Sequence, residues 1–200
     1  MKALLIGGTG LISTAVSKLA LERGIELYLL NRGSKRELEA MGAHYILADI
    51  NDPEVAQAAL RDMEFDVTAD FIAYSPADVE RDYQLLRDKV GQYIFVSSAS
   101  AYRKPIPCHP ITESMPLGNR FWDYSQKKAD AEAWLFQKYL TENFPVTVVR
   151  PSHTYGDSKL IVPLSGAKTQ RTYADRMLRG APIIVHGDGK SLWTVTHNTD

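Results

Sequence analysis

Cysteine is almost absent from this sequence, in which Cys108 is the only one among 200 residues. An internal disulfide framework is therefore excluded. An excess of charge of one sign is also missing, because 23 lysines and arginines face 24 aspartates and glutamates, and the formal net charge is -1. A nearly neutral chain lacks the electrostatic footprint of a general nucleic-acid-binding protein or of one that binds an anionic membrane.

Long apolar runs are missing as well. The first one, Ala3 to Ile6, is too short for a signal peptide or a membrane span. The five histidines include no pair at the helical spacing of metal ligands, which argues against a metal site. We therefore expect a cytoplasmic protein without a metal and without a membrane partner, for which nucleic acid is not the default partner. Hydrophobic residues make up 44% of the chain, which suffices for a buried core.

The apolar residues that are present alternate between two periods along the chain. Short aliphatic or β-branched runs, typical of buried strands, are followed by stretches with helical spacing. This alternation predicts an α/β fold in which a doubly wound parallel sheet carries helices on both faces. The predicted strands are Lys2 to Ile6, Glu26 to Leu30, Ala43 to Leu47, Asp66 to Phe71, Tyr93 to Ser97 and Val146 to Val149.

The clearest predicted helix spans Val79 to Val90. Ser75 supplies an N-cap and Pro76 a first-turn proline. The charged stretch ERDYQLLRDK within this segment is interpreted as a solvated helix face. One apolar stripe is expected to face the sheet, formed by Val79, Tyr83, Leu86 and Val90.

The strand and helix rhythm ends after Arg150. A tract rich in Pro, Gly and Ser begins there, PSHTYGDSKLIVPLSG, and it predicts a departure from the sheet. We expect one domain over residues 1–150 and a second, smaller lobe over 151–200. The chain ends on THNTD directly after SLWTVT, which is patterned as a strand. Because roughly 50 residues are few for a lobe that closes over a ligand, we expect a truncated lobe; the alternative is a minimal protein with an open cleft.

Glycines crowd the turn between the first strand and the first helix, in MKALLIGGTGLIS. Gly7 permits a tight turn, Gly10 lets the backbone approach a ligand, and the helix N-terminus favours a pyrophosphate. The pattern is GxxGxxS, with Ser13 where a third glycine would allow the closest helix packing. It predicts a dinucleotide site, and a purely structural turn is the alternative. The predicted cofactor-binding residues of this loop are Gly7, Thr9, Gly10, Leu11 and Ile12.

The ends of the next two strands bear on which dinucleotide binds. An NAD site normally has a carboxylate about 20 residues beyond the glycines, but here the strand ends in LLNRG. Asn31 can hydrogen-bond a hydroxyl, and Arg32 can pair with a 2′-phosphate or simply be a solvated turn residue. The expected cofactor is NAD(P), leaning toward NADP. After the third strand, Asp49 can accept from the adenine amino group and Ile50 can pack on the ring, unless Asp49 merely caps the next helix.

Two further stretches lie where chemistry is expected, FVSSASAY after the fifth strand and WDYSQKKADAEAWL in the following helix. Tyr124 and Lys128 are four residues apart and therefore share one helix face. An adjacent cation lowers a tyrosine pKa from about 10 toward neutrality, which makes the phenol usable as an acid or base. Trp122, near the start of this helix, is expected to be a helix-packing residue.

Five segments together resemble the extended or atypical short-chain dehydrogenase/reductase superfamily, in its NAD-dependent epimerase/dehydratase group. They are GGTGLIS, ADI, FVSSASAY, YSQKK and RPSHTYG, in the order and approximate spacing of that group. The resemblance implies that Ser98 hydrogen-bonds the reacting oxygen and that Tyr124 is the acid/base. It implies that Lys128 anchors the nicotinamide ribose and lowers the Tyr124 pKa, and that Ala73 and Pro151 also contact the cofactor.

The resemblance implies an NAD(P)-dependent epimerase, dehydratase or reductase acting on a hydroxyl or carbonyl carbon of a sugar-like substrate, with nucleotide sugars among the candidates. It leaves room for a homodimer. Arg103 and Trp193 depart from the group's pattern, and AYSPADVERD looks closest to a branch that includes chloroplast stem-loop RNA-binding proteins. The alternative is therefore a non-catalytic NAD(P)-binding regulatory or RNA-associated protein. An intact Ser, Tyr and Lys set favours the enzyme, because a sensor needs no acid/base pair.

Overall fold

The structure, a computed structural model, describes residues 1–162, 169–190 and 192–200. The chain forms two compact units, Met1–Pro151 and Ser152–Asp200, which are described separately. The end of the Pro, Gly and Ser-rich tract, 163–166, and Ser191 of the predicted final strand lie outside the described residues.

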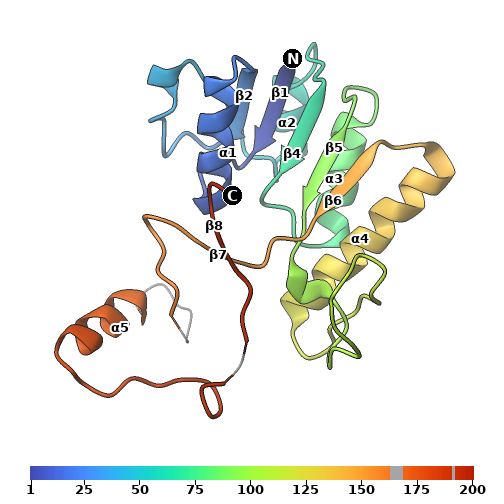
Figure 1. The fold of residues 1–200 in the computed structure, drawn as a ribbon. Helices are drawn as coiled ribbons and strands as arrows, with labels where there is room; N and C mark the ends of the chain where they lie inside the picture. Colours follow the sequence, from blue (N-terminus) through green and yellow to red (C-terminus); the bar gives the residue numbers. More distant parts are fainter. Residues whose placement is uncertain (163–168, 191) are drawn as a thin grey trace. The chain divides into compact units, whose positions relative to one another are not determined.

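Six parallel strands form the sheet of the first unit, in the order β3-β2-β1-β4-β5-β6 (Figure 1). The predicted doubly wound parallel sheet is thereby confirmed. Two predicted strands have the observed bounds, and the other four differ by one residue at one or both ends. The strands are β1 (Lys2–Ile6), β2 (Glu26–Asn31), β3 (His44–Leu47), β4 (Val67–Asp70), β5 (Tyr93–Val96) and β6 (Val146–Val149). The order reverses between β1 and β4, where the carboxyl ends of such strands open a crevice.

Both faces of the sheet are covered, as parallel strands require. Leu4 and Ile6 of β1 join the core under α2, α3 and α4, whereas Ala3 and Leu5 join the opposite core, which includes Ala20 of α1. The elements involved are α1 (Leu11–Glu22), α2 (Pro53–Ala59), α3 (Pro76–Leu86), α4 (Asp123–Glu142) and the short 3-10 helices η1 (Glu39–Met41) and η2 (Ala99–Ala101).

Helix α1 lies close to the sheet because its inward face is small. Its buried residues are Ser13, Ser17 and Ala20. The Ser17 hydroxyl donates to the Gly8 carbonyl at 2.9 Å. A Cβ atom on Gly8 would come within 2.5 Å of the Leu29 side chain. Gly8, which the sequence did not single out, is therefore the glycine that permits close helix-to-sheet packing.

Helix α3 begins as predicted, with Ser75 as N-cap and Pro76 in the first turn, but it ends at Leu86. Val90 lies beyond the helix and forms an isolated parallel bridge with Phe65. The interpretation of the charged stretch as a solvated face is wrong for Asp82, which is fully buried. Asp82 is three residues after Val79 and four before Leu86, so it shares their inward stripe.

In the second unit, β7 (His153–Tyr155) pairs in parallel with β8 (Val195–His197). Helix α5 spans Thr169–Leu178. Across the ranges that the structure describes, no helix combines the length and the apolar character needed to cross a membrane.

Candidate functional site

A groove of about 390 Å³ lies in the first unit, along the segments that follow the carboxyl ends of β1 to β4. This is the crevice expected where the strand order reverses. Six predicted cofactor residues line it: Gly7, Thr9, Asn31, Arg32, Asp49 and Ile50. Eight lining residues were not predicted to bind the cofactor: Leu30, Ser34, Ala48, Asn51, Ile72, Tyr74, Asp78 and Arg81. The other predicted cofactor residues are not part of its lining: Gly10, Leu11, Ile12, Ala73, Lys128 and Pro151.

The glycine loop lines this groove and meets the segment after β4 at Gly7. Gly7 has a φ of 80°, and a Cβ atom there would lie 2.4 Å from Cγ2 of Ile72. Both the backbone conformation and the space therefore require glycine. Ser13 ties the loop together, since its hydroxyl donates to the Gly7 carbonyl and accepts from the Gly10 N–H, each at 2.8 Å. The serine in the variant fingerprint thus stabilises the loop, while Gly8 provides the close packing.

The end of β2 carries an unused hydrogen-bond donor. The Asn31 Oδ1 atom accepts from the Gly33 N–H at 2.8 Å, which fixes the amide orientation. Its Nδ2 atom is buried and has no partner. A buried N–H donor without an acceptor costs free energy unless a ligand oxygen accepts its hydrogen bond. The Asn31 amide and the exposed Arg32 side chain both line the groove, and together they fit the ribose hydroxyls or a 2′-phosphate of a dinucleotide.

Asp49 does not cap a helix. Its Oδ1 atom accepts from the N–H and the side-chain amide of Asn51, at 3.0 and 3.1 Å. The cap of α2 is Asp52, which accepts from the Val55 N–H. The alternative prediction for Asp49 is therefore wrong. The hydrogen bond from the Asn51 backbone, with help from the nearby Arg32 and Arg81 guanidinium groups, lowers the Asp49 pKa, so this carboxylate stays an acceptor on the groove.

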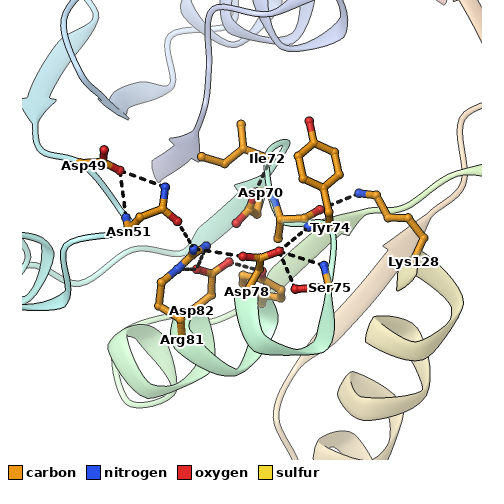
Figure 2. Close-up of polar contacts among 12 residues, drawn as sticks. Asp49, Asn51, Asp70, Ile72, Tyr74, Ser75, Asp78, Arg81, Asp82 and Lys128 are labelled. Carbon is orange, nitrogen blue, oxygen red and sulfur yellow. Dashed lines mark hydrogen bonds and ion pairs between the residues drawn. The ribbon is translucent and has the colours of Figure 1, made fainter. Parts of the chain in front are cut away.

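Arg81 of α3 lines the groove and connects this helix to Asn51, which follows β3 (Figure 2). Its Nε and Nη2 atoms donate to Oδ1 of Asp82 at 2.9 and 2.7 Å, and its Nη1 atom donates to Asn51 at 2.7 Å. Burial and the neighbouring Asp70 carboxyl raise the Asp82 pKa well above its usual range. The Tyr93 hydroxyl also donates to Asp82. The sequence analysis did not identify this contact. Its signal was the adjacent charged pair Arg81 and Asp82, in which Asp82 falls on the apolar stripe of α3.

Lys128 connects three parts of the first unit: its own helix α4, the loop after β4 and the end of β5. Its ammonium donates to the carbonyls of Ala73 and Val96, at 2.7 and 2.6 Å. It also lies over the rings of Tyr74 and Phe95, 5.0 and 4.7 Å from their centres. Burial lowers the Lys128 pKa to about 8. Ala73 is fully buried and contributes a carbonyl for Lys128, while its neighbours Ile72 and Tyr74 line the groove.

The Tyr124 phenol has a raised pKa, which contradicts the expected lowering by Lys128. Burial of the phenol is the largest cause, Tyr74 raises the pKa further, and the Ser98 hydroxyl acts in the opposite direction and lowers it. Burial of the phenol therefore outweighs the effect expected of Lys128, whose ammonium donates to two backbone carbonyls. The Trp122 ring centre lies 5.0 Å from that of Tyr124 and the residue is 56% exposed, so the prediction that Trp122 is a helix-packing residue is wrong.

Ser98 caps η2 directly after β5, and its Oγ atom accepts from the Ser100 N–H at 3.2 Å. The Pro151 carbonyl, after β6, accepts from the Ala99 N–H at 3.0 Å. The ends of β5 and β6 are thus joined next to Ser98 and the start of α4. Within the described residues, no group of three or more His, Cys, Asp or Glu side chains is arranged to hold a metal ion.

The sheet order and the glycine loop define a Rossmann-type α/β fold of the dinucleotide-binding class. The chain belongs to the NAD dependent epimerase/dehydratase family, whose profile matches residues 3–200.

Two curated relatives match nearly the whole chain. The chloroplast stem-loop binding protein of 41 kDa b of Arabidopsis thaliana is 24% identical over 100% of this chain and 52% of its own length. The 2-alkyl-3-oxoalkanoate reductase of Stenotrophomonas maltophilia is 26% identical over 98% of this chain and 62% of its own length. This chain therefore spans between half and two thirds of the length of these relatives.

Among solved structures, dTDP-glucose 4,6-dehydratase from Bacillus anthracis in complex with NAD has a similar fold, with a TM-score of 0.77 and 20% identity. The match covers 100% of this chain and 68% of that one. At 20% identity, this similarity shows a shared fold and no more.

Proposed function

We propose that this protein is an NAD(P)-dependent enzyme of the epimerase, dehydratase or reductase type, acting on a hydroxyl or carbonyl carbon of a sugar-like substrate. The observation that carries the proposal is that the segment after β5, which holds Ser98, is joined to the first turn of α4, which holds the half-buried Tyr124, by the hydrogen bond from the Ser125 hydroxyl to Ser100 at 2.7 Å. An acid/base pair of hydroxyls at the carboxyl edge of a dinucleotide-binding sheet suits proton transfer to or from a substrate oxygen.

In the oxidative direction, the ionised Tyr124 accepts the proton of the substrate hydroxyl as the carbonyl double bond forms. A bound nicotinamide supplies the acceptor for the hydride that leaves the same carbon. Ser98 donates a hydrogen bond to the reacting oxygen. Lys128 has three N–H donors, of which two bind Ala73 and Val96, so the third is available for a ribose hydroxyl. In reduction the proton returns from Tyr124 to the oxygen.

Turnover with a defined panel tests this proposal. Purified protein is supplied with NAD or NADP and UDP-glucose or dTDP-glucose, and with NADH or NADPH and a 2-alkyl-3-oxoalkanoate. Nicotinamide absorbance and mass spectrometry of the products are followed, together with mass spectrometry of small molecules that copurify. Conversion of at least one hydroxyl or carbonyl compound is expected. Bound dinucleotide with no conversion of any panel or copurifying compound would contradict the proposal.

The alternative is a dinucleotide-binding protein that contacts RNA, and the name of the Arabidopsis relative is the observation in its favour. The net charge of -1 weakens it, because binding to the phosphate backbone needs clustered positive charge. A mobility-shift titration with a stem-loop RNA, repeated at rising salt, separates the two candidates. Tight binding without turnover would favour the alternative.

We expect NADP(H) to bind at least as tightly as NAD(H). The end of β2 places Asn31 and Arg32, rather than a carboxylate, on the groove lining, and the unpartnered Asn31 amide can donate to an anionic oxygen. Arg32→Ala should weaken NADP(H) more than NAD(H), whereas Arg23→Ala, an exposed change after α1, should affect neither. Isothermal calorimetry measures all affinities. A preference for NAD(H) of about tenfold, or ~1.4 kcal/mol, would defeat the role given to Arg32.

A further inference from the structure

Three polar side chains of the groove lining form a hydrogen-bonded row from helix α3 to the segment after β3 (Figure 2). Nη1 of Arg81 donates to Oδ1 of Asn51 at 2.7 Å. Nδ2 of Asn51 donates to Oδ1 of Asp49 at 3.1 Å, and the Asn51 backbone N–H donates to the same oxygen at 3.0 Å. The row of Arg81, Asn51 and Asp49 therefore ends at the carboxylate that the sequence assigns to the adenine amino group.

The two neighbours of Asn51 fix the orientation of its side-chain amide. A guanidinium can only donate hydrogen bonds, so Asn51 must turn its oxygen toward Arg81. An ionised carboxylate can only accept them, so the NH₂ group of Asn51 must face Asp49. A flipped amide would place donor against donor at one end and acceptor against acceptor at the other. The row thus has a single arrangement.

The inner end of the row is anchored in the core. Nε and Nη2 of Arg81 donate to Oδ1 of Asp82, which is fully buried and also accepts from the Tyr93 hydroxyl. Nη1 of Arg81 lies 3.4 Å from Oδ1 of Asp78, so this ion pair is the longer of its two contacts. The Arg81 side chain is 15% exposed. The guanidinium is therefore held from the interior while its Nη1 arm extends to Asn51.

The outer end of the row leaves one carboxylate oxygen for a ligand. Each carboxylate oxygen has two lone pairs, and Oδ1 of Asp49 already accepts two hydrogen bonds from Asn51. Within the described part of the chain, Oδ2 of Asp49 accepts none. The Asn51 contacts also lower the Asp49 pKa, so the carboxyl has no proton to give. It can accept from an amino group but cannot donate to an oxo group.

The sheet order indicates which part of a dinucleotide meets Asp49. The strands run β3-β2-β1, so the glycine loop after β1, Asn31 at the end of β2 and Asp49 after β3 follow one another across the sheet edge. The loop suits the pyrophosphate and Asn31 the ribose, which leaves the base for Asp49. Ile50 also lines the groove and offers an apolar contact to a flat ring.

We propose that Asn51 and Arg81 are positioning residues for Asp49, and that their row makes the groove select a 6-amino purine over a 6-oxo purine. This inference rests on the proposed function, which assigns a dinucleotide to this groove. It gives a task in ligand recognition to two side chains that the sequence analysis did not select.

Calorimetry with matched dinucleotides tests the inference without turnover. NAD and NADP are each compared with their hypoxanthine analogues, in which an oxygen replaces the adenine amino group while the phosphates and riboses stay the same. The ratio of the two affinities therefore reports on the base alone. The wild type is expected to bind the adenine form about tenfold more tightly or better, since the analogue loses a hydrogen bond to a charged acceptor.

Variants of Asn51 should lower this ratio. Asn51→Ala removes the amide but keeps the backbone bond to Asp49, and the ratio should fall about threefold to tenfold. Asn51→Asp keeps an oxygen for Arg81 but turns a second oxygen toward Asp49, and the ratio should fall at least as far. Arg81→Lys keeps a cation beside Asp82 but loses the fork, and a smaller fall is expected. The Asn51 variants decide alone if Arg81→Lys does not fold.

Gln57→Ala is the matched control. It removes an exposed amide from helix α2, outside the groove lining, and should leave the ratio unchanged. Chemical denaturation shows whether each variant is folded. A wild-type ratio near one, an unchanged ratio in Asn51→Ala or Asn51→Asp, or an equal fall in Gln57→Ala would overturn the inference.

The outcome also separates the inference from the proposed function. If the ratio depends on Asn51 but no compound of the turnover panel is converted, the proposed function fails and the inference stands. If compounds are converted but the ratio ignores Asn51, the inference alone is wrong. If none of the dinucleotides binds, both are wrong.

Discussion

Tyr124→Phe is expected to lower kcat by about 10²–10⁴-fold, the usual range for loss of a general acid or base. Dinucleotide affinity should stay nearly unchanged, because the phenol acts on the substrate proton and Tyr124 is not part of the groove lining. Steady-state turnover with a converted panel compound and calorimetry with the dinucleotide measure the two properties separately.

Tyr139→Phe is the matched control for this change. Tyr139 lies on the same helix, is 49% exposed, and stacks on Phe136 away from Ser98. It should retain wild-type kinetics. Full activity in Tyr124→Phe would show that the acid/base role belongs to another group, and a large loss of dinucleotide binding would show that the phenol is needed to hold the cofactor.

Lys128→Met should damage both stability and dinucleotide binding. The ammonium satisfies the carbonyls of Ala73 and Val96 in the interior, and methionine would leave both without this donor. An unsatisfied buried group costs about 1–3 kcal/mol. Chemical denaturation and calorimetry measure the losses. Lys127→Met is the control, since Lys127 is exposed and forms only a surface ion pair, so its stability should change by less than about 1 kcal/mol.

The same pair of variants has a defined pH dependence. The pKa of Lys128 is about 8 in the folded protein, below that of an ordinary lysine. The unfolded chain therefore holds more protons between these two values, and the penalty for burying the ammonium fades as the pH rises through them. The free energy of unfolding of the wild type should gain on that of Lys128→Met across this interval. A difference that stays flat with pH would contradict the buried charge.

The sheet could be predicted from the sequence because its signals are local. Runs such as Lys2–Ile6 and Val146–Val149 are short and mostly apolar, the first followed by a glycine and the second flanked by a proline and an arginine, and their observed bounds are the predicted ones. The glycine loop was equally accessible, since Gly7 needs a conformation that few other residues adopt. Those features depend on neighbours in the chain.

The sequence did not predict that Arg81 lines the groove, because its position depends on contacts between residues that are distant in sequence. Asn51 meets Arg81 from a segment 30 residues earlier, and no local pattern announces that contact. The Lys128 environment was misjudged for a similar reason. Its spacing from Tyr124 fixed a shared helix face, but the carbonyl of Ala73, 55 residues away, receives its proton. Spacing on a helix says which side chains are neighbours and leaves open which acceptor is nearest.

The two sides of the groove differ in how freely they can change during evolution. Arg81 is bound to Asn51 and to buried Asp82, so a substitution there disturbs the interior as well as the ligand surface. Arg32 and Ser34 are exposed in the segment after β2. Substitutions at these two exposed positions should have little effect on folding, so selection for another dinucleotide can act on them. A laboratory programme to alter cofactor choice should randomise Arg32 and Ser34 and leave Gly33, whose φ is 78°, and the Arg81 side intact.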